Sequence, residues 1–261
     1  MTDKYAGATR PAAPPAQPLP PQSCDCHLHV FGDPAKFPDR NPNPVHRSRE
    51  ASFDDALRMH AAVGFQRGVF VQPANYTTDH SYLLEALQRV PRGRYRATGI
   101  IDETVTDAEL ARLHAAGMRG VRFNFVGMFK MAPSPRLLRN SMERIAQFGW
   151  YIKIFMGPEE LADTIETLRR ISAVPVVIDH MARLKPDNGA RNPAHDLVLD
   201  LLRRENFWVL LSNGVRMSAQ ASGWDDVVPI GRELRPTAAC SAPTGPTRTA
   251  TGKAAGRRKA S

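Results

Sequence analysis

Two histidines separated by one residue, His27 and His29, form the clearest chemical pattern in the chain. They end a short apolar run in the stretch Cys-Asp-Cys-His-Leu-His-Val-Phe-Gly at 24–32. Side chains at positions i and i+2 of a β-strand point to the same face, so the two imidazoles should project together. Such a pair suits binding of one metal ion or polarisation of one carbonyl group. From the spacing alone, two half-buried structural histidines are the alternative.

The chain up to residue 234 supplies the elements that must position this pair. Short β-like runs alternate with amphipathic helical stretches, which predicts right-handed βαβ units and a parallel sheet. Strands are expected at 24–30, 68–72, 96–101, 120–125, 150–155, 174–179 and 207–212. Seven such units predict an α/β fold of the (β/α)8 TIM-barrel type, incomplete at the C-terminus. A doubly wound open sheet is the competing fold, but no glycine-rich nucleotide-binding motif supports it.

Helix boundaries are marked by capping residues. Ser52 and Thr106 each precede an acidic residue three positions later, the pattern of a capping box that opens a helix. Gly64 and Gly117 follow the last apolar positions of the same two segments and are predicted to end them. The last predicted helix runs from 224 to 234.

Catalytic groups of a barrel come from the C-terminal ends of several strands. We therefore take the polar residues at these ends as candidates. They are His27, His29, Gln72, Thr78, Arg122, Asn124, Lys130, Lys153, Asp179, His180, Ser212 and Arg216. Arginine binds carboxylates bidentately, so Arg122 and Arg216 favour an anionic substrate. Lys153 alternates with two isoleucines and is expected inside the barrel or at its rim.

Four other histidines lie in predicted loops or helices and are interpreted as structural. They are His46, His60, His114 and His195.

Composition divides the chain into three parts. Residues 1–22 are rich in proline and alanine and are expected to form a disordered arm, and 23–234 form the barrel. Residues 235–261 hold six basic and no acidic residues and contain no large apolar side chain, so a disordered tail is expected there. The other 234 residues carry 29 basic and 26 acidic residues, so the net charge of +9 resides mainly in the tail. A tail without aromatic residues argues against nucleic-acid binding.

Three cysteines without a metal-like C-x-x-C pair fit a reducing cytoplasm, and Cys24 and Cys26 are interpreted as buried structural thiols. The N-terminus lacks the apolar core of a secretion signal. No apolar run approaches 18 residues, so neither a membrane span nor a membrane partner is expected.

Four segments resemble a known family. They are Cys-His-Leu-His-Val-Phe-Gly at 26–32, Gly-Met-Arg-Gly-Val-Arg-Phe-Asn at 117–124, Val-Ile-Asp-His-Met at 177–181 and Trp-Asp-Asp at 224–226. Together they resemble the amidohydrolase-2 branch of the amidohydrolase superfamily, and within it the 2-pyrone-4,6-dicarboxylate lactonases. The resemblance runs from about residue 22 to residue 234.

The resemblance implies a distorted barrel and a hydrolase that opens a lactone or related cyclic ester of a small anionic molecule. It gives His27, His29 and His180 the catalytic role, or the role of ligands to one divalent metal ion, most often zinc. The lactonases themselves work without a metal. Arg122 and Arg216 match positions that bind substrate carboxylates, and Asn124, Gln72, Thr78 and Lys130 complete the expected binding set. Sugar-lactone isomerases and decarboxylases of the same superfamily are alternatives.

The chain departs from the family pattern in three places. Lys130 stands only approximately where the lactonases have a second arginine, and Phe155 stands where they have a tyrosine. Family members end with an eighth strand reading roughly Gly-Thr-Asp-Trp-Pro, whose aspartate activates water, and that strand is not expected here.

A frameshift would explain the missing eighth strand. Ala-Pro-Thr-Gly-Pro at 242–246 can be encoded by codons that read Thr-Asp-Trp-Pro in another frame. The expectation is an eighth βα unit lost after about Leu234, which makes a catalytically inactive relative the main alternative to an active hydrolase. An active hydrolase would need another base, such as Asp179 or a group from a partner chain.

Overall fold

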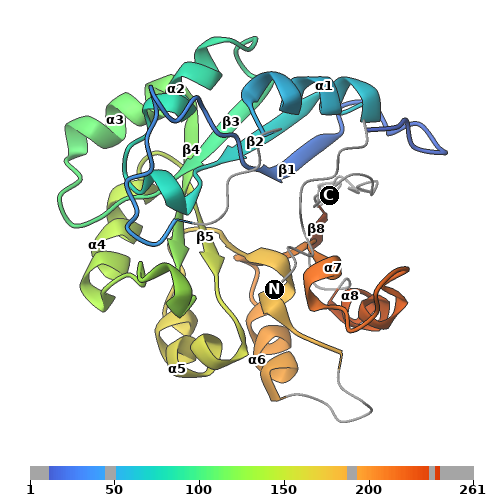
Figure 1. The fold of residues 1–261 in the computed structure, drawn as a ribbon. Helices are drawn as coiled ribbons and strands as arrows, with labels where there is room; N and C mark the ends of the chain where they lie inside the picture. The colour runs from blue at the N-terminus through green and yellow to red at the C-terminus, as the bar shows by residue number, and fades with distance from the viewer. Residues whose placement is uncertain (1–11, 45–50, 187–192, 235–238, 242–261) are drawn as a thin grey trace, which may run out of the picture.

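The computed structural model describes residues 12–44, 51–186, 193–234 and 239–241. Parallel strands form a single sheet in the order β1 to β8, and the sheet curls with helices on its outer side (Figure 1). The strands are β1 Cys24–Leu28, β2 Arg67–Val71, β3 Tyr95–Gly99, β4 Met118–Asn124, β5 Tyr151–Phe155, β6 Val176–Ile178, β7 Phe207–Leu211 and β8 Ala239–Ser241. The predicted barrel type is confirmed, and the strands lie within a few residues of the predicted ranges.

Helices follow the strands in alternation. The longer ones are α1 Phe53–Val63, α2 Ser81–Gln88, α3 Asp107–Ala116, α4 Pro135–Ala146, α5 Pro158–Arg169, α6 Pro193–Leu202 and α8 Val228–Leu234. Shorter turns are α7 Gly214–Met217 and the 3₁₀ segments η1 Ala74–Tyr76, η2 Gly127–Phe129, η3 Asp179–Arg183 and η4 Asp225–Val227. Among the described residues, no helix has the length and apolar character needed to cross a bilayer.

Local sequence signals determine where α1 begins and ends. The Ser52 side chain accepts a hydrogen bond from the Asp55 backbone, and the Asp55 side chain accepts one from the Ser52 backbone. Gly64 ends the helix in a left-handed conformation, which glycine adopts without the steric cost of a Cβ atom. Phe53, Ala56, His60 and Val63 of α1 are buried, so α1 packs firmly over the sheet behind β1 and β2.

Strand β8 contradicts one expectation. Ala239, Cys240 and Ser241 pair in parallel with Val209, Leu210 and Leu211 of β7, although the sequence predicts no strand after residue 234. Strand pairing uses backbone groups, so the open edge of β7 can hold a segment that lacks an apolar strand pattern. No ladder joins β8 to β1 within the described parts of the chain. The remainder of the expected tail, 235–238 and 242–261, lies outside the described residues.

Part of the expected N-terminal arm is packed against the protein. Leu19 and Ala12 contact the buried pair Val63 and Phe65 near the end of α1. The Gln22 backbone N–H also donates to the Gln66 side chain at 2.8 Å. The prediction of a disordered arm therefore does not describe residues 12–22, because an apolar surface beside α1 is available to them. Residues 1–11, and likewise His46, lie outside the described residues.

His80 precedes α2 and is buried. Its Nε2 accepts a hydrogen bond from the Ile100 backbone N–H at 3.2 Å. Burial lowers the pKa of His80 to about 4, against an opposing effect of Glu109. The folded protein thus holds this imidazole neutral, whereas the unfolded chain protonates it near pH 6.5.

The pKa of His80 predicts a loss of stability in acid. A pKa lowered by folding stabilises the fold fully above about pH 6.5, and the contribution is lost as pH falls toward 4. At pH 5 the loss amounts to about 2 kcal/mol. His80→Gln keeps an acceptor for Ile100 but does not titrate, so its unfolding free energy should fall less between pH 7.5 and pH 5. Urea unfolding at both pH values measures this difference, and an equal fall in both proteins would contradict it.

Candidate active site

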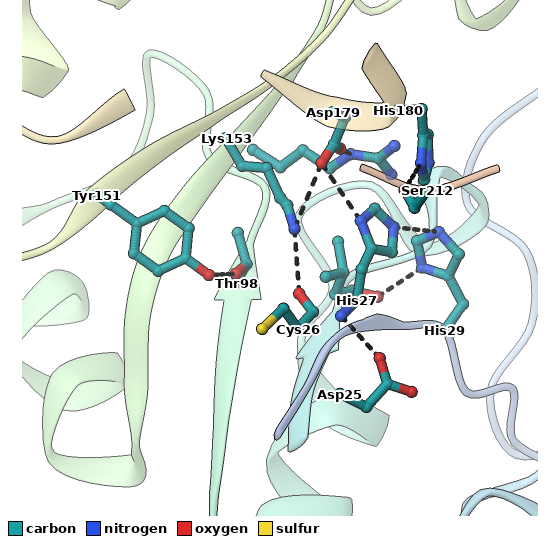
Figure 2. Close-up of polar contacts among 12 residues, drawn as sticks. Asp25, Cys26, His27, His29, Thr98, Tyr151, Lys153, Asp179, His180 and Ser212 are labelled. Atoms are coloured by element: carbon teal, nitrogen blue, oxygen red, sulfur yellow. Dashed lines mark hydrogen bonds and ion pairs between the residues drawn. The ribbon is translucent and has the colours of Figure 1, made fainter. Parts of the chain in front are cut away.

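The two histidines of the H-x-H pair converge as the spacing predicts. His27 Nε2 lies 3.3 Å from His29 Nε2, and the two rings meet edge to face (Figure 2). His29 donates from Nδ1 to the Val71 carbonyl at 2.8 Å, which leaves its Nε2 unprotonated when the ring is neutral. The ring of His180 lies 4.8 Å from that of His27, centroid to centroid. All three predicted histidines therefore meet at the C-terminal ends of β1 and β6.

Asp179 is a fully buried carboxylate at the centre of the site. Three nitrogen atoms lie 3.3 Å from its oxygens: Lys153 Nζ and His27 Nδ1 at Oδ1, and Arg122 Nε at Oδ2. Lys153 and Arg122 are themselves buried, on β5 and β4. Burial alone would raise the pKa of Asp179, but the charge of Lys153, the interaction with His27 and the charge of Arg122 hold it well below its usual range. Asp179 is therefore an ionised anchor for two buried cations and too weak a base to activate water efficiently.

The histidines are held neutral by their surroundings. Burial and then the charge of Lys153 lower the pKa of His27 well below 6.5. Burial and Arg122 lower the pKa of His29 to about 3. Burial lowers the pKa of His180 to about 4, although Asp179 opposes the shift. At neutral pH all three imidazoles can act as lone-pair donors.

Neither tautomer of neutral His27 gives both of its ring nitrogens a suitable partner. If His27 Nδ1–H points to Asp179, the Nε2 lone pairs of His27 and His29 face each other across 3.3 Å. If Nε2 carries the proton instead, the Nδ1 lone pair faces the Asp179 carboxylate. A cation between the two Nε2 atoms would resolve the conflict. Two nitrogen ligands of a tetrahedral zinc ion are about 3.3 Å apart, so the pair fits a zinc ion in type and spacing.

Other atoms could complete a metal site. His27, Asp179 and His180 offer ligand atoms that all lie within 4.8 Å of one another. His180 Nδ1 contacts the Ser212 hydroxyl at 2.6 Å, so its Nε2 is left to face a metal ion or a substrate. Ser212, at the end of β7, thus orients His180 in the way that outer groups orient metal-binding histidines.

His180 begins a turn of unusual backbone conformation. His180, Met181, Ala182 and Arg183 all have positive φ angles, between 51° and 54°. None of the four is glycine, and the first three are buried. The turn directs His180 from the end of β6 toward His27, and Phe155 packs edge to face against the His180 ring.

A cavity of about 360 Å³ is lined by Arg122, whose Nε lies 3.3 Å from Asp179, and its lining includes none of the three histidines. Asn124, Thr77 and Thr78 also line it, and the buried Asn124 amide has no hydrogen-bond partner at either polar atom. The Arg122 guanidinium carbon lies over the Phe155 ring, 5.0 Å from its centre. An unpaired amide next to a buried arginine suits a ligand with carbonyl or carboxylate oxygens.

The remaining predicted binding residues lie elsewhere or have other contacts. The Gln72 side chain donates to the backbone carbonyls of Thr77 and Asp79 at 3.2 and 2.7 Å, so it holds the loop beside the cavity. Lys130 and Arg216 are exposed. The charge of Arg216 contributes to the lowered pKa of His180, which places it near the cluster, whereas Lys130 does not line the cavity.

Three residues have larger roles than the sequence indicates. Lys153 faces the interior as its alternation with isoleucines suggests, but its ion pair with Asp179 depends on the pairing of β5 with β6. Asp179 is a candidate by its place at a strand end, and the only role that the sequence suggests for it is that of a substitute base. Ser212 follows β7, and its position at a strand end is the only sequence feature that indicates a role for it.

Comparison with known proteins agrees with this architecture. The amidohydrolase family model Amidohydro_2 matches residues 24–239. A 2-pyrone-4,6-dicarbaxylate hydrolase from Comamonas testosteroni is 32% identical over 247 residues, covering 89% of this chain and 77% of that protein. A 4-sulfomuconolactone hydrolase from Hydrogenophaga intermedia is 29% identical over 217 residues, covering 83% and 71%.

Solved structures show the same fold. A Pseudomonas putida structure described as a 2-pyrone-4,6-dicarboxylic acid hydrolase superposes with a TM-score of 0.72 at 29% identity, covering 86% of this chain and 83% of that one. A protein from Acinetobacter baumannii with bound citric acid gives a TM-score of 0.74 at 24% identity, covering 85% and 83%, which supports the fold alone. The family match over most of the chain, together with the curled parallel sheet and its histidine cluster, places this protein in the amidohydrolase family of hydrolytic enzymes.

Proposed function

We propose that this chain hydrolyses a lactone that carries a carboxylate or a similar anionic group. The observation that carries the proposal is the convergence of His27, His29 and His180 beside the buried Arg122. The relatives named as lactone hydrolases direct the choice of substrate to cyclic esters. The alternatives within the superfamily, isomerisation and decarboxylation, have no comparable support among these relatives.

Each residue has a proposed role. His180, with its Nδ1 accepting from the Ser212 hydroxyl, donates from Nε2–H to the lactone carbonyl and polarises it. The Nε2 lone pairs of His27 and His29 accept hydrogen bonds from the water that adds to the carbonyl carbon. The acyl carbon–oxygen bond then breaks, one water proton ends on the ring oxygen, and the new carboxylic acid loses its proton to solvent as the carboxylate is released. Arg122 and, from the exposed rim, Arg216 bind the substrate's anionic group. Asn124 and Thr78 contact its polar oxygens inside the cavity.

Gln72 positions the loop that carries Thr78, and Lys130 contributes a positive charge farther from the site.

A zinc ion, when bound, would be held by His27, His29 and His180. It would supply a Lewis acid that polarises the carbonyl and lowers the pKa of a bound water. The fit rests on the facing Nε2 atoms of His27 and His29. Metal analysis of the purified protein, and titration of the apoprotein with zinc, test this assignment. We further place the protein in the reducing cytoplasm, in accord with the thiols of Cys24 and Cys26.

Ring opening of 2-pyrone-4,6-dicarboxylate and 4-sulfomuconolactone tests the main proposal. Wild-type protein should hydrolyse at least one of them. His180→Asn should lower kcat by roughly 10²–10⁴-fold, because it removes a group that acts on the reacting carbonyl. His195→Asn, in helix α6, is the matched control and should retain activity. Equal activity of wild type and His180→Asn would contradict the assigned role.

Binding without turnover is the second candidate. Within the described residues, β8 consists of Ala239, Cys240 and Ser241, and none of them is an acid that could activate water. Asp179 is tied to two cations and is a poor replacement. Calorimetric binding of the dicarboxylate without ring opening would establish this reading, and absence of both binding and turnover would contradict both candidates.

A further inference from the structure

Between Asp25 and Leu28, strand β1 contains one residue more than the segment of β2 with which it pairs. Asp25 pairs with Gly68, and the next pair in the ladder is Leu28 with Phe70. Three steps along β1 thus match two steps along β2, which is a β-bulge at Cys26 and His27. The bulge lies immediately before the site.

The bulge reverses the direction in which His27 points. Asp25 faces the helix side of the sheet, where it contacts His60 of α1. Without the extra residue, His27 would share that face with Asp25 and point away from His180. With it, the His27 ring lies on the opposite side of the strand from Asp25, among Lys153, Asp179 and His29 (Figure 2).

Side chains bind two backbone groups at the bulge. The His27 backbone N–H donates to Asp25 Oδ1 at 3.0 Å. The Cys26 carbonyl accepts from Lys153 Nζ at 3.2 Å. The two backbone groups that define the bulge are therefore held from opposite faces of the sheet.

Behind Asp25 lies a buried polar chain that the proposed reaction does not use. Asp25 Oδ2 is 3.1 Å from His60 Nε2, and His60 Nδ1 is 2.9 Å from the Tyr95 hydroxyl. A proton on Nε2 satisfies both contacts: Nε2–H donates to Asp25 and Nδ1 accepts from Tyr95. All three side chains are at most 7% exposed.

Gly68 makes room for this chain. It lies between Asp25 and Tyr95 in the strand register. A Cβ atom at Gly68 would lie 2.7 Å from the Tyr95 ring and 2.9 Å from the His60 ring. Glycine is therefore needed at this position for His60 and Tyr95 to reach each other behind the sheet.

We propose that Asp25, His60 and Tyr95 form a positioning network that fixes the bulge in β1 and thereby aims His27 into the active site. The three are positioning residues, since none touches the space beside His27 and His180. The network extends the interpretation of His60 as structural. Its consequence for turnover rests on the proposed hydrolysis, whereas its effect on the backbone does not.

Hydrogen exchange of the His27 amide tests the network without any substrate. Asp25→Ala removes the acceptor of this N–H, and exchange should become roughly 10–100-fold faster. Asp25→Asn retains an acceptor oxygen and should accelerate exchange by less than about tenfold. Gly68→Ala should resemble Asp25→Ala, because the added methyl group displaces His60 and Tyr95.

A core variant distinguishes positioning from loss of stability. Val198→Ala in α6 removes buried apolar volume far along the chain and should leave His27 exchange unchanged relative to neighbouring amides of β1. If Asp25→Ala does not fold, Asp25→Asn and Tyr95→Phe still test the network through smaller changes at the same amide. Equal His27 exchange in the Asp25, Gly68 and Val198 variants would overturn the proposal.

Kinetics provide a second, separate measurement. Where wild type turns over, Asp25→Ala should lower kcat roughly 10–100-fold and leave KM nearly unchanged, because His27 is misplaced while Arg122 still binds the anion. A fall in kcat that Asp25→Asn does not restore in part would contradict positioning. If wild type shows no turnover, the proposed function fails, and the exchange measurement still decides on the network.

Discussion

Asp179→Asn should lower the free energy of unfolding by about 3–5 kcal/mol. The substitution keeps the size of the side chain but removes the charge that Lys153 and Arg122 share inside the protein. Both cations are at most 5% exposed, so neither can be solvated in place of the lost ion pair. The loss is a large fraction of the roughly 5–15 kcal/mol that stabilises a typical domain. Urea unfolding at pH 7.5 measures it.

An exposed ion pair provides the matched control. Asp107→Asn removes the same charge from a pair with Arg144, but the Asp107 side chain is 75% exposed. Such pairs contribute about 0–1 kcal/mol. Adding Lys153→Met to Asp179→Asn should recover part of the lost stability, because one unpaired cation disappears. A loss for Asp179→Asn no greater than for Asp107→Asn would show that Asp179 does not compensate these charges.

Restoring the proposed reading frame should raise lactone hydrolysis by roughly 10²–10⁴-fold, the range expected for regaining a general base. Codons that encode residues 239–246 can also be read in a shifted frame. That frame can encode Val, Leu or Met, followed by Leu or Phe, and then by Gly-Thr-Asp-Trp-Pro. The first two residues of that reading are apolar and would replace Ala239, Cys240 and Ser241 in the chain. Those three residues already occupy the eighth position of the sheet, so the restored segment would enter at the right place.

The control for this comparison is a restored chain whose new aspartate is replaced by asparagine. It should fold like the restored chain but keep the low rate of the present one. Equal kcat/KM for the present and the restored chain would contradict the frameshift explanation. Coding DNA whose codons do not permit the alternative reading would contradict it as well.

The sequence predicts most of the barrel, because strand and helix periodicities are local. It misses α7, since four residues are too few to show a helical period, and β8, whose residues carry no apolar pattern. The pairing of β8 depends on the edge of β7, which only the folded sheet provides. Likewise, the bulge at Cys26 and His27 depends on the register between β1 and β2.

Residue type and strand position predict the histidine cluster, because i and i+2 placement is a property of a single strand. They do not predict the role of Asp179, which depends on Lys153 and Arg122 from two other strands. The chemical type of Gln72 suits a ligand, yet its amide hydrogen bonds go to the backbone of its own loop. Contacts of this kind depend on loop conformation, for which the sequence offers no periodic signal.

The left-handed turn from His180 to Arg183 has a thermodynamic consequence for the whole protein. A non-glycine residue in this conformation costs about 1–2 kcal/mol, and four follow one another here. The fold stabilises this turn with free energy gained elsewhere, so placing His180 consumes part of a small margin of stability. Variants selected only for higher thermal stability should therefore soon acquire substitutions that remove the positive φ angles of this turn. Such substitutions would displace His180 and disturb the geometry around His27.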